Sequence, residues 1–495
     1  MRRIASSIIL ALLFLSLFAF AFTLQTARAQ GYIWILANGS IASSGQPANI
    51  TTSDNITYTF TGNNYLPMMV DRSNIIINGM GHKLQAPGGY GFTLQTMSNV
   101  TIKNTIITNS AFGIYLYSSS GNALLDNHIT TNSSFAIQLY GSSGNTLSGN
   151  TVTTTGGDGI ELYASSDNNT LSGNNVTANG DVGIDLESSS NSNTLSGNNV
   201  TANNVGVYLD LSSGNVLSGN NVTANSLGVD LGSSSGNVLF GNNVTANSYY
   251  GIYLYSSSDN TFYHNNFINA QQVYSDSSSN TWDNGYPSGG NYWSDYRTRY
   301  PNAVENDSSA IWNTPYNVSS GNIDRYPLMG PFDTFGVGTW NGTAYSVDTV
   351  SNSTITNVSF DPATKTLSFN VTGANGTAGF CRISIPLSLM SGEWTVTVNG
   401  TQLSAPNLNI TTYGNYAYIY FTYHHSTETV KIQSTSAIPE FPSLLILPLF
   451  MIATLLAVVI YKKRKIVLGC SSGYIHLFQL VQARYSWNPH LLFIP

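Results

Sequence analysis

The apolar positions in the middle of the chain follow a repeat of short segments. Four copies read NTLSGNTV, NTLSGNNV, NTLSGNNV and NVLSGNNV in chain order. The spacing between copies, 20 to 25 residues, is typical of one coil of a solenoid. The leading asparagines of the repeat are Asn74, Asn99, Asn122, Asn145, Asn169, Asn193, Asn215, Asn237, Asn260 and Asn280.

The pattern inside each unit distinguishes a β-helix from a leucine-rich repeat. In one unit the apolar positions are Leu171, Val176, Ile184 and Leu186, which are separated by Gly, Asn or Ser and lack the i, i+3, i+4 spacing of a helix. Three short strands per unit, with Gly and Asn at the corners, fit this pattern. We therefore predict an all-β fold whose body is a right-handed parallel β-helix of about ten coils.

Stacked coils place equivalent side chains over one another at a spacing of about 4.8 Å. The leading asparagines are expected to form an amide ladder at a corner. Each coil buries apolar residues only against its neighbours, so both ends need caps. The three predicted interior files are Leu147, Leu171, Leu195, Leu217 and Leu239; Val152, Val176, Val200, Val222 and Val244; and Ile160, Ile184, Val207, Val229 and Ile252.

Both ends of the chain carry targeting signals. Arg2 and Arg3 precede an apolar run and the small-x-small sequence at 27–29, which is typical of a signal peptide, with a retained N-terminal anchor as the alternative. Leu444 to Tyr461 is apolar and is followed by four basic residues, which predicts a membrane-spanning helix with a cytoplasmic C-terminus. The protein is therefore expected in the cell membrane as a single-pass protein with an extracellular body.

The remaining segments complete the expected organisation. Aromatic, Gly- and Pro-rich residues after the last coil suit a lid, and period-two strands divided by Asn-Gly turns predict a small β-sandwich. The expected parts are a signal peptide (1–29), an N-terminal cap (30–72), the parallel β-helix (73–285), an aromatic C-terminal lid (286–333), a β-sandwich stalk (334–435), a transmembrane helix (436–461) and a cytoplasmic tail (462–495).

Charge and cysteine content exclude several kinds of protein. Charged residues make up 8% of the chain, and between Lys103 and Arg297 there is no Lys or Arg, so nucleic acid is not an expected partner. Cys381 and Cys470 fall on opposite sides of the predicted membrane span and cannot pair. Export makes glycosylation of the repeat sequons at Asn175, Asn199, Asn221 and Asn243 a candidate modification, although an Asn/Thr-rich repeat also produces sequons by chance.

Candidate chemistry gathers on the outward positions of the strand that carries the third interior file. Tyrosines at both ends and carboxylates at the centre predict a wall that stacks and hydrogen-bonds sugar rings, or binds Ca²⁺ through oxygen atoms. The alternative is that these residues decorate a solvated strand. The first column is Tyr115, Gln138, Glu161, Asp185, Tyr208, Asp230 and Tyr253, and the second is Tyr117, Tyr140, Tyr163, Glu187, Asp210, Gly232 and Tyr255.

Catalysis and copper binding are less well supported by the residues. Glu161 and Asp185, one coil apart, suit the spacing of a glycoside hydrolase, but an exposed wall does not raise a carboxyl pKa, and a lyase needs a basic group that these coils lack. Copper needs converging His, Met or Cys ligands. The copper candidates Met68, Met69, Met80, His82 and Met97 are expected to pack the N-terminal cap or occupy a turn instead.

Motifs near the end of the repeat resemble a known family. The sequence FYHNNFIN at Phe262, the aromatic segment from Trp282 to Tyr296, the TPY at Thr314 and the DRYPLM at Asp324 resemble the NosD-type family of right-handed β-helix proteins, over roughly 31–332. The family is named for periplasmic copper binding, and its coils overlap a class found in carbohydrate-binding proteins and sugar hydrolases. The segment 306–313 replaces the family's acidic, Gly-rich turn, so a cation site there is in doubt.

A second resemblance concerns the membrane end. The sequence PEFP at Pro439 resembles the PEF-type C-terminal anchoring segments of archaeal surface proteins. Together these observations predict a membrane-anchored extracellular β-helix that binds carbohydrate or adheres at the cell surface. The alternatives are a passive structural envelope protein, a polysaccharide-processing enzyme and a NosD-like copper-binding accessory protein.

Overall fold

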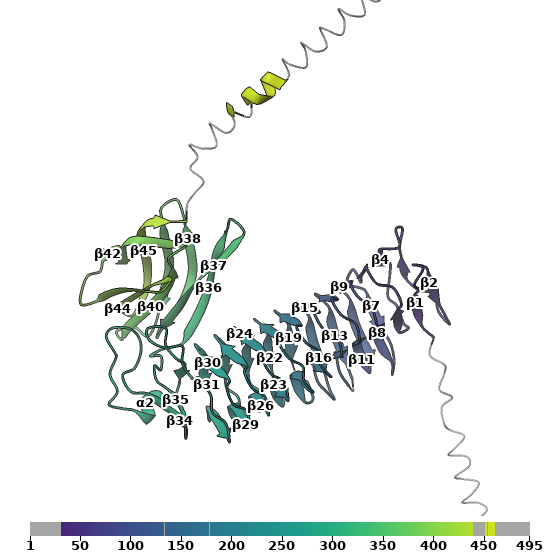
Figure 1. The fold of residues 1–495 in the computed structure, drawn as a ribbon, viewed down its shortest axis with the longest axis horizontal. Helices are drawn as coiled ribbons and strands as arrows, with labels where there is room; N and C mark the ends of the chain where they lie inside the picture. The colour runs from purple at the N-terminus through teal and green to yellow at the C-terminus, as the bar shows by residue number, and fades with distance from the viewer. Residues whose placement is uncertain (1–30, 133, 178, 439–450, 453, 461–495) are drawn as a thin grey trace, which may run out of the picture.

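The body of the protein is a stack of parallel coils, as the repeat predicts. The computed structural model describes residues 31–132, 134–177, 179–438, 451–452 and 454–460. Three long sheets run side by side along the stack in this part of the chain, and each coil contributes one strand to each sheet (Figure 1). The prediction of an all-β parallel solenoid of about ten turns is confirmed.

The three sheets are named A, B and C. Sheet A consists of β2 (Ile41–Ser43), β1 (Ile33–Ile35), β5 (Met68–Val70), β8 (Tyr90–Gln95), β11 (Phe112–Tyr117), β14 (Ile137–Tyr140), β17 (Ile160–Tyr163), β20 (Val182–Leu186), β23 (Val205–Asp210), β26 (Leu227–Gly232), β29 (Tyr250–Tyr255) and β32 (Val273–Asp276). Sheet B consists of β3 (Ile50–Thr51), β4 (Thr57–Phe60), β6 (Ile75–Asn78), β9 (Val100–Lys103), β12 (Ala123–Leu125), β15 (Thr146–Ser148), β18 (Thr170–Ser172), β21 (Thr194–Ser196), β24 (Val216–Ser218), β27 (Val238–Phe240) and β30 (Thr261–Tyr263). Sheet C consists of β7 (Lys83–Gln85), β10 (Ile106–Ser110), β13 (His128–Thr131), β16 (Thr151–Thr154), β19 (Asn175–Thr177), β22 (Asn199–Thr201), β25 (Asn221–Thr223), β28 (Asn243–Thr245), β31 (Asn266–Ile268) and β33 (Tyr292–Trp293).

The interior of the stack is the apolar core that the repeat predicts. The leucine file lies on sheet B, the valine file on sheet C and the isoleucine and valine file on sheet A, and all of these side chains are buried. In each file the residue of one coil is the register partner of its equivalent in the next, as in Leu171 and Leu195. Stacking therefore joins the few apolar residues of each unit into a continuous core.

Amide ladders hold the corners of the stack. The backbone N–H and the Nδ2 group of Asn145 both donate to Oδ1 of Asn169 in the next coil, at 2.8 and 3.1 Å. This bonding along the leading asparagines, from Asn122 to Asn280, confirms the predicted ladder. At the first two coils, Asn99 instead donates back to Asn74 at an exposed corner.

Further ladders were not predicted from the sequence. One consists of Asn127, Asn150, Asn174, Asn198, Asn220, Asn242, Asn265 and Asn291. Another consists of Asn179, Asn203, Asn225, Asn247 and Asn269. A serine ladder consists of Ser119, Ser142, Ser166, Ser190, Ser212, Ser234, Ser257 and Ser278. Because these polar side chains are buried almost without exception, the ladders satisfy backbone groups that the corners leave unpaired.

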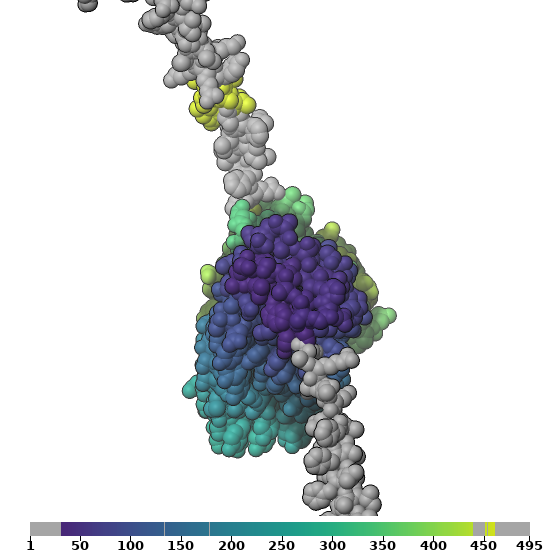
Figure 2. Space-filling view, turned by 90° about the vertical axis from the view of Figure 1, so that its right-hand side faces the viewer, coloured from purple at the N-terminus to yellow at the C-terminus, as the bar shows by residue number. Residues whose placement is uncertain are grey.

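Caps close the two ends of the stack. At the N-terminal end, drawn in purple in Figure 2, β2 pairs antiparallel with β1, β3 pairs antiparallel with β4, and the buried Tyr58 hydroxyl donates to the Gly39 carbonyl at 2.7 Å. At the other end, Trp282 stacks on Phe262 with ring centroids 4.3 Å apart, and Trp293 stacks on Tyr316 at 4.1 Å. This lid also contains α2 (Tyr296–Arg299), β34 (Tyr316–Ser319) and β35 (Asn322–Asp324).

Residues after the lid form two antiparallel five-stranded sheets within the described part of the chain, with an apolar core between them. This β-sandwich lies at the lid end of the stack (Figure 1). One sheet is β36 (Phe332–Trp340), β37 (Thr343–Ser351), β40 (Ala378–Pro386), β44 (Tyr416–His424) and β43 (Leu408–Tyr413). The other is β38 (Thr354–Asp361), β39 (Thr366–Thr372), β45 (Thr427–Ala437), β41 (Met390–Val398) and β42 (Thr401–Gln402).

Polar contacts fix the sandwich against the lid. The buried Arg382 guanidinium donates to the carbonyls of Pro287, Ser288 and Ser309 at 2.9 to 3.0 Å. The side chain of Asn266, in β31, exchanges two hydrogen bonds of 2.8 Å with the backbone of Phe332. The sandwich is thus docked on the solenoid by buried, charge-assisted hydrogen bonds.

The predicted targeting segments fall mainly outside the described residues. This holds for the signal peptide at 1–29, for the tail at 462–495 and for most of the predicted span at 436–461. Residues 451–452 and 454–460 are helical, and their large apolar side chains are exposed. No helix among the residues described here has both the length and the apolar character to cross a membrane.

The ladders give a direct test of what holds the corners. Asn174→Ala removes an acceptor for the Asn150 N–H and a donor to the Leu147 carbonyl, and it leaves both backbone groups buried. We expect a loss of about 1–3 kcal/mol in the free energy of unfolding, seen as a lower urea midpoint. The exposed turn residue Asn302 provides the control, and equal midpoints for Asn174→Ala and Asn302→Ala would contradict a structural role for the ladder.

Candidate functional site

The two predicted columns lie side by side along the outer face of sheet A. Parallel register places Tyr115, Gln138, Glu161 and Asp185 over one another, and the column continues through Tyr208, Asp230 and Tyr253. The second column has the same register from Tyr117 to Tyr163 and from Asp210 to Tyr255, with Glu187 directly after β20. We call this face the sheet A strip.

Aromatic rings form the N-terminal end of the strip. Tyr117 and Tyr140 have ring centroids 5.3 Å apart, and Tyr140 and Tyr163 lie 5.5 Å apart. Tyr115 contacts Tyr117 and the rings of the coil before it. Tyr117 is 37% exposed and Tyr140 is 36% exposed, so a ribbed aromatic surface faces solvent here.

A second aromatic group forms the C-terminal end. Tyr253 stacks on Tyr274 at 4.6 Å with an interplanar angle of 10°. Tyr255 is 53% exposed, and its register partner in the preceding coil is Gly232, which has no side chain. The next residue along the column is Asp210. The column therefore carries no side chain at Gly232, a position that we call the slot, and Asp210 Oδ1 lies over it, 3.0 Å from where a Cβ at Gly232 would be.

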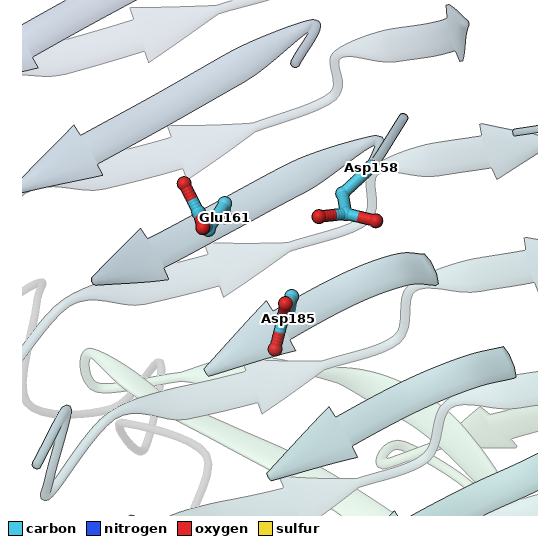
Figure 3. Close-up of side chains that lie close together, drawn as sticks. All are labelled: Asp158, Glu161 and Asp185. Atoms are coloured by element: carbon cyan, nitrogen blue, oxygen red, sulfur yellow. The ribbon is translucent and has the colours of Figure 1, made fainter. Parts of the chain in front are cut away.

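Three carboxylates meet at the centre of the strip. Asp158 lies in the loop before β17, Glu161 lies on β17 and Asp185 lies on β20 (Figure 3). One oxygen from each of the three lies within 4.8 Å of the others. Gln138 donates a hydrogen bond to Glu161 Oε2, and the Val182 N–H donates to Asp158 Oδ1 at 2.9 Å. We call these three residues the carboxylate cluster.

The carboxylate cluster is buried, which corrects the expectation of an exposed wall. The exposed fractions are 9% for Asp158, 7% for Glu161 and 3% for Asp185. Burial, reinforced by the neighbouring carboxylates, raises the pKa of Glu161 to about 7 and that of Asp185 to about 10. Burial also raises the pKa of Asp158, Glu187 and Asp230. The expectation that the carboxyl groups of this wall have no raised pKa is therefore wrong.

Among the described residues, every charged group that acts on the carboxylate cluster is itself acidic. Asp185 Oδ1 is shielded from solvent and has no hydrogen-bond partner among the described residues. The sequence has no Lys or Arg between Lys103 and Arg297, so the coils that carry the cluster supply no lysine or arginine side chain. A buried carboxylate without a partner is costly, and this favours either protonation or an external cation.

Asp158 is the member of the cluster that the sequence reasoning missed. It lies outside both columns, in a Gly-rich loop that was not assigned to the strip. A signal was present, because this loop immediately precedes the strand that carries Glu161, two residues before the interior Ile160. Whether a carboxylate just before a strand reaches the outer face of that strand depends on the length of the loop. The repeat does not determine this loop length.

The copper candidates lie at different corners of the first coils. Met68 is buried in β5 with Met69 beside it, and Met97 packs against the core between β8 and β9. Met80 is 60% exposed and lies with His82 in the turn between β6 and β7. The candidates thus lie on a sheet A strand, between sheets A and B and between sheets B and C, rather than at one point.

The four glycosylation candidates stack on sheet C. Asn199, Asn221 and Asn243 each donate through Nδ2 to the amide oxygen of the preceding coil, at 2.7 to 2.9 Å, starting at Asn175. The nitrogen that a glycan would modify thus takes part in a ladder at three of the four positions. Glycosylation at these sites stays a prediction.

A larger cleft lies between the solenoid and the sandwich. Its volume is about 1170 Å³, and its lining includes Phe240, Tyr263, Asp333, Asp348 and Tyr418. Phe240 and Tyr263 stack at 5.3 Å, and Asp348 accepts a hydrogen bond from Thr334 at 2.8 Å. Some polar side chains of the cleft are thus hydrogen-bonded, whereas the carboxylate cluster retains a buried oxygen without a hydrogen-bond partner. The strip is the better candidate site for that reason.

Fold and strip together define a right-handed parallel β-helix protein with an aromatic and acidic outer face. A family model for the right handed beta helix region matches residues 41–222, and one for the periplasmic copper-binding protein (NosD) matches residues 179–298. The resemblance to NosD-type β-helix proteins is therefore confirmed over the β-helix region. No curated protein sequence matches the chain significantly.

Solved structures with similar folds are distant. The periplasmic alginate epimerase AlgG, in a mutant form, is 15% identical, with 50% of this chain and 83% of that chain covered and a TM-score of 0.35. The pectate lyase Pel9A is 16% identical, with 46% and 70% covered and a TM-score of 0.30. A Geobacillus virus E2 protein is 13% identical, with 66% and 64% covered and a TM-score of 0.40.

The raised pKa values predict how stability depends on pH. A carboxyl group with a higher pKa in the folded state holds its proton there over the interval in which the unfolded chain has lost it, so the free energy of unfolding falls as pH rises through that interval. For Glu161 the interval runs from the ordinary glutamate pKa of 4.5 to about 7, and for Asp185 from the ordinary aspartate pKa of 3.8 to about 10. In chelator-treated protein, the urea midpoint should fall from pH 5 to pH 9.

Asp185→Asn removes one of these groups and should flatten the decline, with higher stability than the unsubstituted protein at pH 8. Asp276→Asn, an exposed position at the end of the same sheet, is the matched control and should leave the pH profile unchanged. An unaltered profile in Asp185→Asn would show that the carboxylate cluster is not the source of the pH dependence.

Proposed function

We propose that this protein binds glycans along the sheet A strip. The observation that carries the proposal is the row of exposed tyrosine rings on both sides of an acidic centre, all on one face of the solenoid. Aromatic rings provide an apolar surface for the C–H faces of sugars, and carboxylates accept hydrogen bonds from sugar hydroxyls. The strip is straight and several coils long, which suits an extended chain better than a compact ligand.

The slot at Gly232 is the best-defined subsite of the strip. The Asp210 carboxylate reaches over Gly232 toward Tyr255, so a sugar ring stacked on the exposed Tyr255 ring could donate a hydroxyl hydrogen bond to it. The strip itself carries acidic groups and no Lys or Arg, so anionic sugars are repelled. The preferred ligand is therefore a neutral polysaccharide.

Binding is favoured over hydrolysis and over copper binding. A glycosidase needs its two carboxyl groups on either side of the scissile bond, with room for the sugar. The carboxylate cluster lies at no more than 9% exposure, with its oxygens on one side of the sheet, so a sugar ring has little access to it. The methionines and His82 lie at separate corners of the cap, which does not favour a copper centre there.

Display at the cell surface completes the proposal. The N-terminal apolar segment exports the chain, and the apolar segment from Leu444 to Tyr461, followed by four basic residues, anchors it with the solenoid outside and the C-terminus in the cytoplasm. The sandwich then connects the membrane to the lid. In this arrangement the strip extends away from the anchor and is free to meet polysaccharides of the envelope or of the environment.

Glycan binding is tested with the purified full chain on an array of neutral and uronic-acid oligosaccharides. We expect binding to neutral sugars, with an affinity lowered about tenfold by Tyr255→Ala because one stacking surface is lost. Gly232→Gln should lower it similarly by filling the slot. A Cβ at Gly232 lies 3.0 Å from the flexible Asp210 side chain, so this variant should fold.

The matched control is Tyr65→Ala, because Tyr65 is similarly exposed at 50% but lies in the N-terminal cap. Equal binding by all of these variants, or preference for uronic acids, would refute the strip as the binding surface. Release of reducing sugars by the unsubstituted chain would identify a hydrolase instead.

Anchoring is tested by truncating the chain after residue 438. We expect the unaltered chain to sediment with membranes and to resist extraction by high salt, because apolar insertion rather than charge holds it. The truncated chain should appear in the soluble fraction with the same thermal midpoint for the solenoid. Retention of the truncated chain on membranes would disprove anchoring by the C-terminal segment.

A further inference from the structure

We propose that the carboxylate cluster of Asp158, Glu161 and Asp185 binds a divalent, oxygen-preferring cation of the Ca²⁺ type. The proposal concerns a site beneath the strip and does not require a glycan. It rests on the geometry of the three carboxylates, on an unpaired buried oxygen and on the absence of Lys and Arg from the coils around the cluster.

The geometry suits one shared ion. Ca²⁺ is bound by oxygen atoms at 2.3–2.6 Å, so two ligands on opposite sides of the ion are at most roughly 5 Å apart. One oxygen from each carboxylate of the cluster lies within 4.8 Å of the other two. The three atoms therefore fit the coordination sphere of a single ion without a change in the backbone.

An unpaired oxygen within the cluster points independently to a ligand. Asp185 is 3% exposed, and its Oδ1 atom has neither solvent contact nor a hydrogen-bond partner in the described structure. Such groups are rare in native proteins because they carry the full cost of desolvation. The other two carboxylates each have one donor, Gln138 for Glu161 and the Val182 N–H for Asp158, and these donors hold them in place.

The electrostatic surroundings select a cation. The charged groups around Asp185 are the carboxylates of Glu187, Asp158, Glu161 and Asp181, all of the same sign. Between Lys103 and Arg297 the sequence has no lysine or arginine to offset them. A divalent ion at this position offsets two of the negative charges and stabilises the ionised form of all three ligands.

The ligand set favours Ca²⁺ over Mg²⁺ and over transition metals. All three ligands are carboxylates, with no His or Cys among them, and hard oxygen donors suit Ca²⁺ and Mg²⁺. Mg²⁺ needs near-ideal octahedral geometry and releases water reluctantly, whereas Ca²⁺ accepts irregular sites. The ligands come from a loop and two successive strands, which is an irregular arrangement.

The test uses the full chain after treatment with EDTA and removal of the chelator, in the absence of any glycan. Titration with CaCl₂, followed by calorimetry and by thermal unfolding, should give saturable binding with a dissociation constant on the order of 10⁻⁴–10⁻³ M and a rise in the unfolding midpoint. MgCl₂ at the same concentrations should produce a smaller rise.

Asp185→Asn is the decisive variant. It preserves side-chain shape and removes a buried charge, so it should fold, unfold at a higher temperature than the unsubstituted chain without calcium, and bind calcium at least tenfold more weakly. Asp276→Asn, exposed on the same sheet, should bind as the unsubstituted chain does. The proposal would be overturned if the unsubstituted chain showed no response to calcium, or if Asp185→Asn responded as strongly as the unsubstituted chain. Because no glycan is present in this experiment, its outcome does not depend on whether the strip binds glycans.

Discussion

Direct stacking of each coil on the one before it is the constraint on which this structure depends. A side chain on one coil has its equivalent directly above and below it, about 4.8 Å away. This arrangement is favourable for apolar side chains, as in the file from Leu147 to Leu239, and for amides, which both donate and accept, as in the ladder from Asn122 to Asn280. It is unfavourable for carboxylates, which can only repel one another unless a proton or a cation lies between them.

The strip on sheet A shows both sides of this constraint. Tyrosines in register stack on one another and leave their outer edges in solvent, so they form a surface at little energetic cost. Glu161 over Asp185 is the opposite case, because stacking brings two acids together at a buried position. Such a pair persists where the remainder of the fold is stable enough to tolerate it, and a long core with several polar ladders provides that stability.

The sequence was sufficient to predict what depends on the repeat itself. The interior files, the ladder of leading asparagines and the register of both columns follow from a period of 20 to 25 residues and an alternation of side chains. It was insufficient where neighbouring loops decide the outcome. Burial of Glu161 and Asp185, the approach of Asp158 and the docking of Arg382 on the lid depend on loop paths and on segments distant in sequence, for which the repeat carries no information.

The way the lid closes the end of the stack has a consequence for assembly. A stack of parallel strands ends in unsatisfied donors and acceptors, and such an end can template the addition of another chain. Here the outer edge of β33, the last strand of sheet C, already bridges to the lid, because Tyr292 pairs with Leu328 and the Leu328 N–H donates to the Asn291 carbonyl at 2.9 Å. The lid thus occupies the edge of sheet C that another chain would otherwise extend.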